Sequence, residues 1–556
     1  MSSTNYKLLH TRDERLTNQP VHFAVKTGGS SISNVEYNAQ SKSTTSHSWQ
    51  INPPAGVFID RRVMWKSKFR IKLSGIARAG ARLVEYGTNT ILAPFPLHEM
   101  CLNQTAQVNG SSVSVNVNDI KAGLLQLYRN EDLALLNSTS PTQRDNYYDY
   151  TQATAFANSP FNNYTKTYGD RIPRGAYTID AIVDAGGNGD GAANRDVFIT
   201  VSVEEPLLFL SPFAHIGDRS GIWGCTNLNF IFNLNASNTN NRVIRSSKAG
   251  VLAGNPLLCV IDEFIESKLI LKYITPQANQ VIDPICSLPY YETPRYITSI
   301  PAFAGASNTV NMDTITINSI PDSLLIFVRK QLSSQTVSDS DSFYPITNIK
   351  INWNNNSGLL GTENEQSLFN ITKTNGVNTD WLRYHGVANT ATNANATLLC
   401  GAILKLDMGR DVVLEPYQSA GSVGQYTLGM TVTYTNQELN VPCELVVVAI
   451  NSGVFVINSG GTSQIFTSIL TKNDVLTATE EEPVPHQHIE RLIGGSWMNK
   501  LKTIGSHVLP FIKKHAPAFR EHVLEKSENP YLQTAGKVMK AVGYGKSGGA
   551  LHKYIK

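Results

Sequence analysis

The sequence is poor in charged residues and in cysteine. Only 16% of its 556 residues are Asp, Glu, Lys or Arg, against roughly a quarter in a typical soluble domain. Its solubility must therefore come from Asn, Ser, Thr and Gln. A composition of this kind is typical of β-sandwiches with long polar loops, or of a protein whose surface is largely covered in an assembly. The six cysteines are scattered and form no Cys-x-x-Cys pair, which argues against a disulfide framework or a zinc site.

Long apolar runs are also lacking. The first twenty residues, MSSTNYKLLHTRDERLTNQP, contain no apolar stretch, so we expect no signal peptide. No run approaches the roughly 20 apolar residues that a membrane-spanning helix needs. We therefore expect synthesis in a reducing compartment, the cytoplasm or the nucleus.

Motifs of catalysis and ligand binding are absent or incomplete. There is no G-x-S-x-G and no H-E-x-x-H. The stretch GYGKSGG near the C-terminus has Lys540 where a phosphate-binding loop needs its first glycine. The stretch DAGGNGDG has Gly186 and Arg195 where a calcium loop needs ligands, and is typical of a hairpin tip instead.

The remaining candidates for chemistry have simpler explanations. His486 and His488 lie in a proline-rich stretch that gives a metal no fixed geometry. The carboxylate pairs Glu204–Glu205 and Asp262–Glu263 are typical of exposed acids at the ends of strands or helices. The sequence thus predicts no enzyme, no cofactor and no metal site.

Most of the chain is typical of strands separated by turns. In WKSKFRIKL (65–73) apolar residues alternate with cations, apart from one slip, which predicts a long half-buried strand. The segments 178–184 and 196–203 flank a Gly- and Asn-rich stretch and predict a hairpin. Helical spacing is strongest in 117–128 and 260–270, the best helix candidates in this part of the chain. Long strands with few helices between them favour sandwiches over a β-α-β sheet.

The chain divides where breakers cluster. AHIGDRSGI (214–222) and the acidic, proline-broken TATEEEPVPHQH (477–488) mark two boundaries. Each half of the body is long enough for a complete eight-stranded jelly roll. We expect an all-β fold of two tandem jelly-roll sandwiches and a short helical, basic C-terminal tail. The expected divisions are an N-terminal arm 1–19, a first jelly roll 20–216, a second jelly roll 217–476, a linker 477–493 and a tail 494–556.

The tail differs in charge from the body. Residues 494–556 carry eleven Lys and Arg against three Glu, whereas the rest of the chain carries 36 Lys and Arg against 41 Asp and Glu. This asymmetry favours a polyanion or an anionic membrane as the partner of the tail, through cations such as Lys500, Lys502, Lys513, Lys514, Lys537 and Lys540.

The start of the tail has apolar residues at helical spacing. A docked core helix, a helix in a membrane interface with its Trp at headgroup depth, and a nucleic-acid contact all fit this pattern. Pro510 is expected to kink the helix. The apolar residues are Trp497, Leu501, Ile504, Val508, Leu509, Phe511 and Ile512.

The order of segments in the body resembles that of double jelly-roll major capsid proteins. These segments are EEPLLFLSPF, IWGCTNLNFIFNL, IPDSLLIFVRK, YPITNIKINWNNNSGLL, GAILKLDMGRDVVL with GQYTLGMTVTYTNQ, and VVVAINSGVFV with TSILTKNDVL. The family is shared by adenoviruses and tectiviruses, and the resemblance is closest to small eukaryotic DNA viruses such as polinton-like viruses and virophages.

The resemblance implies a structural role in a virion. Each subunit would supply two sandwiches, and three subunits would make a pseudo-hexagonal capsomer that tiles an icosahedral shell. It further implies synthesis in the host cytoplasm, assembly in the cytoplasm or nucleus, and contacts with penton and minor capsid proteins.

The junction of linker and tail is similar to a viral processing signal. Leu492, Gly494, Gly495 and Ser496 match the cleavage pattern of adenovirus-type maturation proteases, and the product that would begin at Ser496 resembles the adenovirus membrane-lytic protein. This implies a tail that is cut after Gly495 and acts on membranes, or that contacts the genome.

Two other functions fit a strand-rich chain. One is a single jelly-roll capsid protein of an RNA virus with a projecting domain, although a strongly basic N-terminal arm is missing. The other is a carbohydrate-binding β-sandwich protein, although the secretion signal expected of it is missing.

Overall fold

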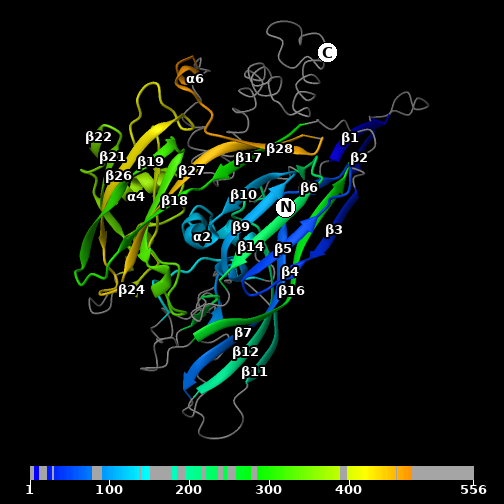
Figure 1. The fold of residues 1–556 in the computed structure, drawn as a ribbon, viewed down its shortest axis with the longest axis horizontal. Helices are drawn as coiled ribbons and strands as arrows, with labels where there is room; N and C mark the ends of the chain where they lie inside the picture. Colours follow the sequence, from blue (N-terminus) through cyan, green and yellow to red (C-terminus); the bar gives the residue numbers. More distant parts are fainter. Residues whose placement is uncertain are drawn as a thin grey trace.

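The structure is a computed structural model in which strands dominate (Figure 1). The all-β prediction is confirmed in the part of the chain that the structure describes. These residues are 6–11, 22–27, 31–77, 90–136, 140–150, 178–184, 194–213, 221–235, 242–246, 258–276, 285–388, 397–458 and 460–477.

The first sandwich pairs a five-stranded sheet with a seven-stranded sheet. The five-stranded sheet has the order β10-β9-β14-β5-β4, and the other has the order β11-β12-β7-β16-β6-β13 with β3 also on β16. All pairings within the two sheets are antiparallel. The strands are β3 (Ser31–Asn38), β4 (Ser41–Lys42), β5 (Ser46–Ile51), β6 (Phe58–Asp60), β7 (Met64–Ala77), β9 (Cys101–Val108), β10 (Ser111–Val115), β11 (Thr178–Asp184), β12 (Asn194–Pro206), β13 (Gly221–Ile222), β14 (Leu228–Leu234) and β16 (Leu258–Thr275).

The second sandwich pairs a six-stranded sheet with a four-stranded sheet. The larger sheet has the order β17-β27-β20-β25, and β18 and β28 both pair with the long strand β27. The smaller sheet has the order β19-β26-β21-β22. The strands are β17 (Ile285–Glu292), β18 (Arg295–Ile300), β19 (Ser307–Ser319), β20 (Ser323–Lys330), β21 (Ile346–Trp353), β22 (Asn356–Leu359), β25 (Leu404–Asp407), β26 (Val423–Thr435), β27 (Cys443–Asn458) and β28 (Thr462–Thr467).

Smaller elements complete the described chain. Three two-stranded pairs join β1 to β2, β8 to β15 and β23 to β24. They are β1 (Tyr6–Thr11), β2 (His22–Thr27), β8 (Thr90–Leu92), β15 (Ile244–Ser246), β23 (Val387–Ala388) and β24 (Thr397–Leu398). The helices are α1 (Pro96–Glu99), α2 (Val117–Leu125), α3 (Asn130–Leu135), η1 (Leu332–Ser334), α4 (Glu365–Thr374), α5 (Trp381–His385) and α6 (Lys472–Thr477).

Strand β7 forms as its alternation predicts. Trp65, Phe69 and Ile71 are fully buried, while the cations between them lie on the half-exposed face. The slip in the pattern is Ser67, which also points inward. Its hydroxyl donates to the Glu266 carbonyl at 2.8 Å, so a polar side chain is tolerated in the core because its hydrogen bond is made. The hairpin of β11 and β12 is confirmed as well.

The stretch 260–270 lies in strand β16 and is not the helix that its spacing predicts. Its pairing with β7 shifts register between Ile261 and Glu263 and again between Phe264 and Glu266. Each bulge adds one residue to the strand. Buried positions therefore fall three apart, at Ile261, Phe264 and Ser267, which imitates helical periodicity. The other candidate is confirmed as helix α2.

Strand pairing divides the body later than the breakers near residue 216 predict. Strands β13, β14 and β16 follow that point, yet all three pair with strands of the first sandwich. The pairing within the second sandwich begins with Ile285. The two sandwiches lie side by side, and the ends of β7, β11 and β12 extend beyond them at the bottom of the view (Figure 1).

Candidate functional site at the junction of the two sandwiches

Strands β20 and β27 form a layer that is covered on both faces. Leu325 and Phe327 point into the core of the first sandwich, while Leu324, Ile326 and Val328 point into the core of the second. Alternate residues of β27 divide in the same way: Val446, Val448 and Ile450 belong to the first core, and Leu445, Val447 and Ala449 belong to the second. One sheet therefore serves both cores.

Helix α2 of the first sandwich packs closely against this layer. A Cβ atom on Gly123 would lie 2.7 Å from Cε1 of Phe327, closer than carbon atoms normally approach. Phe327 is itself fully buried and packs edge-on against Phe343. The helix can approach the sheet only because residue 123 has no side chain.

The segment 140–150 runs from the first sandwich across the second. Its backbone bonds to two loops there: Tyr150 N–H donates to the Ser338 carbonyl at 2.7 Å, and Cys400 N–H donates to the Asn146 carbonyl at 3.1 Å. The Ser340 hydroxyl donates to the Tyr148 carbonyl at 2.6 Å. We call this the crossing segment. It fixes the register of one sandwich against the other.

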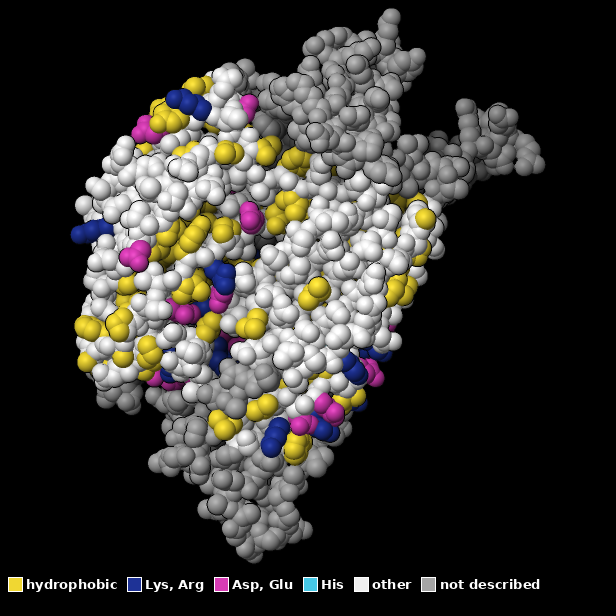
Figure 2. Space-filling view, viewed as in Figure 1, with side chains coloured by type: hydrophobic (Ala, Val, Ile, Leu, Met, Phe, Trp, Pro, Cys, Tyr) yellow, Lys and Arg dark blue, Asp and Glu magenta, His cyan; other side chains and the backbone are white. Residues whose placement is uncertain are grey.

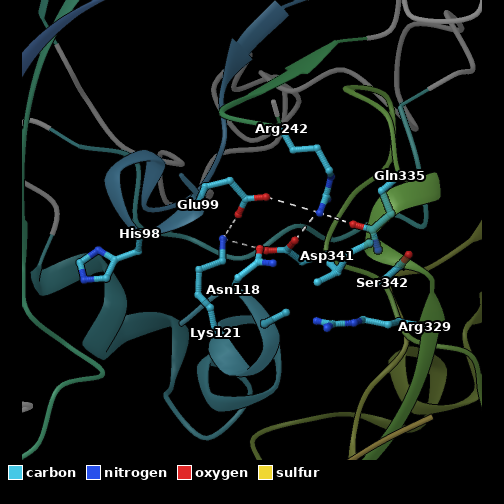
Figure 3. A pocket seen from close by; sticks show the side chains of 11 residues that line it. His98, Glu99, Asn118, Lys121, Arg242, Arg329, Gln335, Asp341 and Ser342 are labelled. Carbon is cyan, nitrogen blue, oxygen red and sulfur yellow. Dashed lines mark hydrogen bonds and ion pairs between the residues drawn. The ribbon is translucent and has the colours of Figure 1, made fainter. Parts of the chain in front are cut away.

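A cluster of buried charges lies where these elements meet (Figure 3). Asp341, from the second sandwich, contacts three cations from the first: Lys121 at 3.2 Å, Arg242 at 3.2 Å and Arg245 at 3.1 Å. Glu99 of α1 accepts from Lys121 and lies 3.4 Å from Arg242. We call these five residues the junction cluster.

The crossing segment adds one more carboxylate beside this cluster. Asp145 contacts Nε of Arg245 at 3.1 Å and accepts from the backbone N–H of Asp341 at 3.0 Å. It therefore bonds to a cation of the first sandwich and to the backbone of the second at once.

The electrostatics of the cluster favour the charged forms. Burial alone would raise the pKa of Asp341, but Lys121, Arg245 and Arg242 outweigh it and hold that pKa well below its ordinary value. Burial opposes charge on Lys121 and Arg245 too, yet the surrounding carboxylates raise the pKa of both. Asp341, Lys121 and Arg245 are thus ionised at neutral pH.

Glu205 positions the helix that carries Glu99. Its carboxylate accepts from the backbone N–H groups of Leu97 and His98 at 2.9 and 3.2 Å, and from Nδ1 of His98 at 2.7 Å. The Ser140 hydroxyl donates to it at 2.9 Å.

Glu205 is fully buried, so the interpretation of the Glu204–Glu205 pair as exposed acids is wrong for Glu205. Two of the other acids fit that interpretation better, because Asp262 and Glu263 are partly exposed and pair with Arg70.

The residues expected to act in the tail lie outside the described residues. This holds for the processing positions Leu492, Gly494, Gly495 and Ser496, for the apolar helix positions between Trp497 and Ile512, and for the six lysines. In the described chain, none of the helices has the length and apolar character to cross a bilayer. Within the same residues, no group of three or more His, Cys, Asp or Glu side chains could hold a metal ion.

Sequence reasoning missed the junction, although one signal for it was present. The runs LLIFV in β20 and LVVVAI in β27 are apolar without alternation, which is typical of strands buried on both faces. No comparable pattern marks Arg242, Arg245 or Asp341, because the residues that meet there come from distant parts of the chain.

Comparisons with known proteins agree with this architecture. The family model described as Sputnik virophage major capsid protein 1st domain matches residues 4–274, and the model described as Major capsid protein V20 C-terminal domain matches residues 293–453. The putative capsid protein V20 of Sputnik virophage is 28% identical over 565 residues, covering 96% of this chain and 92% of the relative.

Solved structures are similar over most of the chain. A chain in the cryo-EM structure of the Sputnik virophage has a TM-score of 0.73 and 26% identity, with 88% of this chain and all of that chain covered. The mavirus major capsid protein has a TM-score of 0.67 and 16% identity, with 81% and 93% covered, and shows the shared fold.

The contact between Gly123 and Phe327 leads to a prediction. Gly123→Ala should destabilise the protein by about 1–3 kcal/mol through overpacking, even though alanine favours a helix over glycine by roughly 1 kcal/mol. Gly460→Ala is the control, since nothing lies within 4 Å of its added Cβ. Denaturant unfolding of both variants measures the difference, and equal stabilities would contradict the packing described.

Asp341 leads to a second prediction. Asp341→Asn leaves three buried cations short of a partner and should destabilise the protein by about 3–5 kcal/mol. Asp313→Asn, on the exposed face of β19, should have little effect.

The same change should alter the response to acid. Because the pKa of Asp341 is lowered in the folded state, the unfolded chain binds more protons in acid, and the stability from this group is present above about pH 4 and lost below it. Denaturant unfolding measured between pH 3 and pH 7 should therefore show a weaker dependence on pH in Asp341→Asn. An unchanged acid profile would count against the assigned ion pairs.

Proposed function

The chain belongs to the double jelly-roll major capsid proteins represented by the Sputnik virophage, and from this premise we propose that it acts as a homotrimer. It is a component of the virion that forms an icosahedral shell with other copies of itself, and its family is structural, not enzymatic. The alternatives of a single jelly-roll capsid protein and of a carbohydrate-binding protein are thereby overturned. Three subunits with two sandwiches each would give a pseudo-hexagonal capsomer.

Two sheets present outer faces that suit contacts between copies. On the five-stranded sheet, Asn229 donates to Gln107 at 3.1 Å and Asn233 donates to Asn103 at 2.8 Å. The surface over β9, β10 and β14 is almost free of charged side chains (Figure 2). Such a face can be covered without removing charges from water, and interface centres are depleted of charged residues. The scarcity of charge on this outer face is the main observation that supports the proposed contacts between copies.

The four-stranded sheet also carries polar side-chain ladders on its outer face. Thr309 and Thr433 share a hydrogen bond of 3.0 Å, and Thr431 donates to Asn311 at 2.8 Å. These ladders keep the side chains in fixed positions, so little conformational entropy is lost when a neighbour covers them. We propose that subunits meet through such faces, and that penton and minor capsid proteins meet the completed capsomers.

We propose that the tail faces the interior of the shell. The charge difference between body and tail supports this, because a cationic segment gains most from the phosphates of a genome or of an internal membrane. The pattern around Gly495 supports a further step, in which a viral maturation protease releases a tail that disturbs a host membrane. Residues 477–493 would then act as the linker that exposes the cleavage point.

We further propose that assembly takes place in the cytoplasm or nucleus of the host.

The outer face of the five-stranded sheet leads to a prediction about assembly. Ile231 lies on this face and is 47% exposed, so Ile231→Lys would force a neighbour to bury an unpaired charge. We expect the variant to unfold like the native subunit but to form trimers at least tenfold more weakly, as measured by analytical ultracentrifugation and negative-stain microscopy. Trimers of unchanged affinity would exclude this face from the subunit contact.

The tail leads to a prediction about membranes. A synthetic peptide of residues 496–526 should become helical and release dye from anionic vesicles, because its cations bind the headgroups and its apolar face enters the interface. A matched peptide with Gln at Lys500, Lys502, Lys513 and Lys514 should release far less. Absence of leakage and of helix induction by circular dichroism would overturn the membrane role and leave the genome as the partner to test.

A further inference from the structure

The junction cluster borders a small polar cavity. Arg329 of β20, Arg242, Lys121 and Gln335 line it (Figure 3), and its volume is about 20 Å³. Roughly 10–15 Å³ is enough for one water-sized species. The cavity can therefore hold a single small ion or molecule, and has no room for a phosphate or a larger ligand.

Arg329 directs an unpartnered donor into this cavity. Its Nε donates to Oε1 of Glu444 at 2.7 Å. Its guanidinium group points toward Lys121 in Figure 3, and among the described residues Nη2 has no hydrogen-bond partner. Arg329 is only 3% exposed, and a buried donor without a partner destabilises the folded protein.

Arg242 contributes a second donor of the same kind. Its terminal nitrogens contact Gln335, the Asp339 carbonyl at 3.0 Å and Asp341 at 3.2 Å. Its Nε, however, also lacks a partner within the described chain. Arg242 belongs to the first sandwich and Arg329 to the second, and both residues line the cavity.

The charged acceptors on the cavity wall are already engaged. Glu99 and Asp341 each accept from cations of the junction cluster, and Oε1 of Gln335 accepts from Arg242. The Nε2 atom of His98 also lacks a partner, but its ring turns away toward Glu205. The group that fits must accept hydrogen bonds, and the uncharged acceptors left for it to donate to are the side-chain oxygens of Asn118 and Ser342.

Charge on the wall favours an anion over water. Lys121, Arg242 and Arg329 contribute three positive charges against the two of Glu99 and Asp341, and Glu444, which pairs with Arg329, does not line the cavity. A water molecule needs acceptors for its two hydrogens, and the carboxylates of this wall already accept from cations, whereas a halide ion needs no acceptor. We propose that this cavity binds one monatomic monovalent anion, of the size of chloride, that bridges Arg242 and Arg329.

The bridge would link the two sandwiches. An anion held between Arg242 and Arg329 binds only when the sandwiches are joined as they are here, so it stabilises the joined subunit by mass action. The stability of the protein should then depend on the identity of the anion, and not merely on ionic strength. This inference concerns the single subunit and is independent of the proposed trimer and tail.

Crystals of the full chain grown in sodium bromide provide the direct test. The expected result is an anomalous difference peak in the cavity, within about 3.5 Å of Nη2 of Arg329. Electron density there without an anomalous signal would identify water and overturn the proposal. Bromide peaks confined to the protein surface would overturn it equally.

Thermal unfolding provides the second test. At constant ionic strength, replacing gluconate by chloride should raise the melting temperature by roughly 2 °C or more. Arg329→Met should lose this response, while Arg295→Met, whose ion pair with Asp119 of α2 does not line the cavity, should keep it. If Arg329→Met does not fold, Arg329→Lys replaces it, with a weakened response expected because the fixed Nη2 donor is gone. An unchanged response in whichever variant folds would refute the assignment.

Discussion

The sheet that contains β20 and β27 has apolar side chains on both of its faces, and neither face can be exposed to water without a large loss of stability. Each buried Leu, Val or Phe side chain contributes roughly 1.5–3 kcal/mol, and the two strands supply many of them to each core. The second sandwich closes one face and the first sandwich closes the other. The two sandwiches therefore behave as one body, which is what a building block of a shell requires.

Apolar burial holds the two sandwiches together, and the charged groups determine how they are aligned. Hydrophobic contact is not directional, so packing against β20 and β27 alone would permit small slides of one sandwich over the other. The junction cluster removes that freedom, because Asp341 must meet three cations at once. The crossing segment adds backbone hydrogen bonds in a fixed register. A buried ionic cluster of this kind adds little net stability over apolar packing, and its contribution here is to geometry.

The distribution of polarity over the molecule fits its role in a shell. Paired charges gather in the junction and on the half-exposed face of β7 and β16, while the outer face of the five-stranded sheet carries amide ladders in their place. Each amide can exchange its hydrogen bonds with water for hydrogen bonds with a neighbour, at a lower desolvation penalty than an ion would incur. A chain with so few charged residues can thus present broad surfaces to its copies.

The sequence alone determined the class of fold and the inward face of most strands, because alternation is a local property of a few consecutive residues. Strand β7 shows this directly. The unbroken apolar runs of β20 and β27 are typical of strands buried on both faces, but sequence reasoning missed this signal. Local periodicity failed at β16, where two bulges made a strand resemble a helix. Only the tertiary structure decided that β14 and β16 complete the first sandwich, that Glu205 is buried beneath α1, and that Asp341 meets Lys121, Arg242 and Arg245. The physical reason is that these contacts join residues far apart in the chain, and the polar groups become partners only because apolar packing has first brought the sandwiches together.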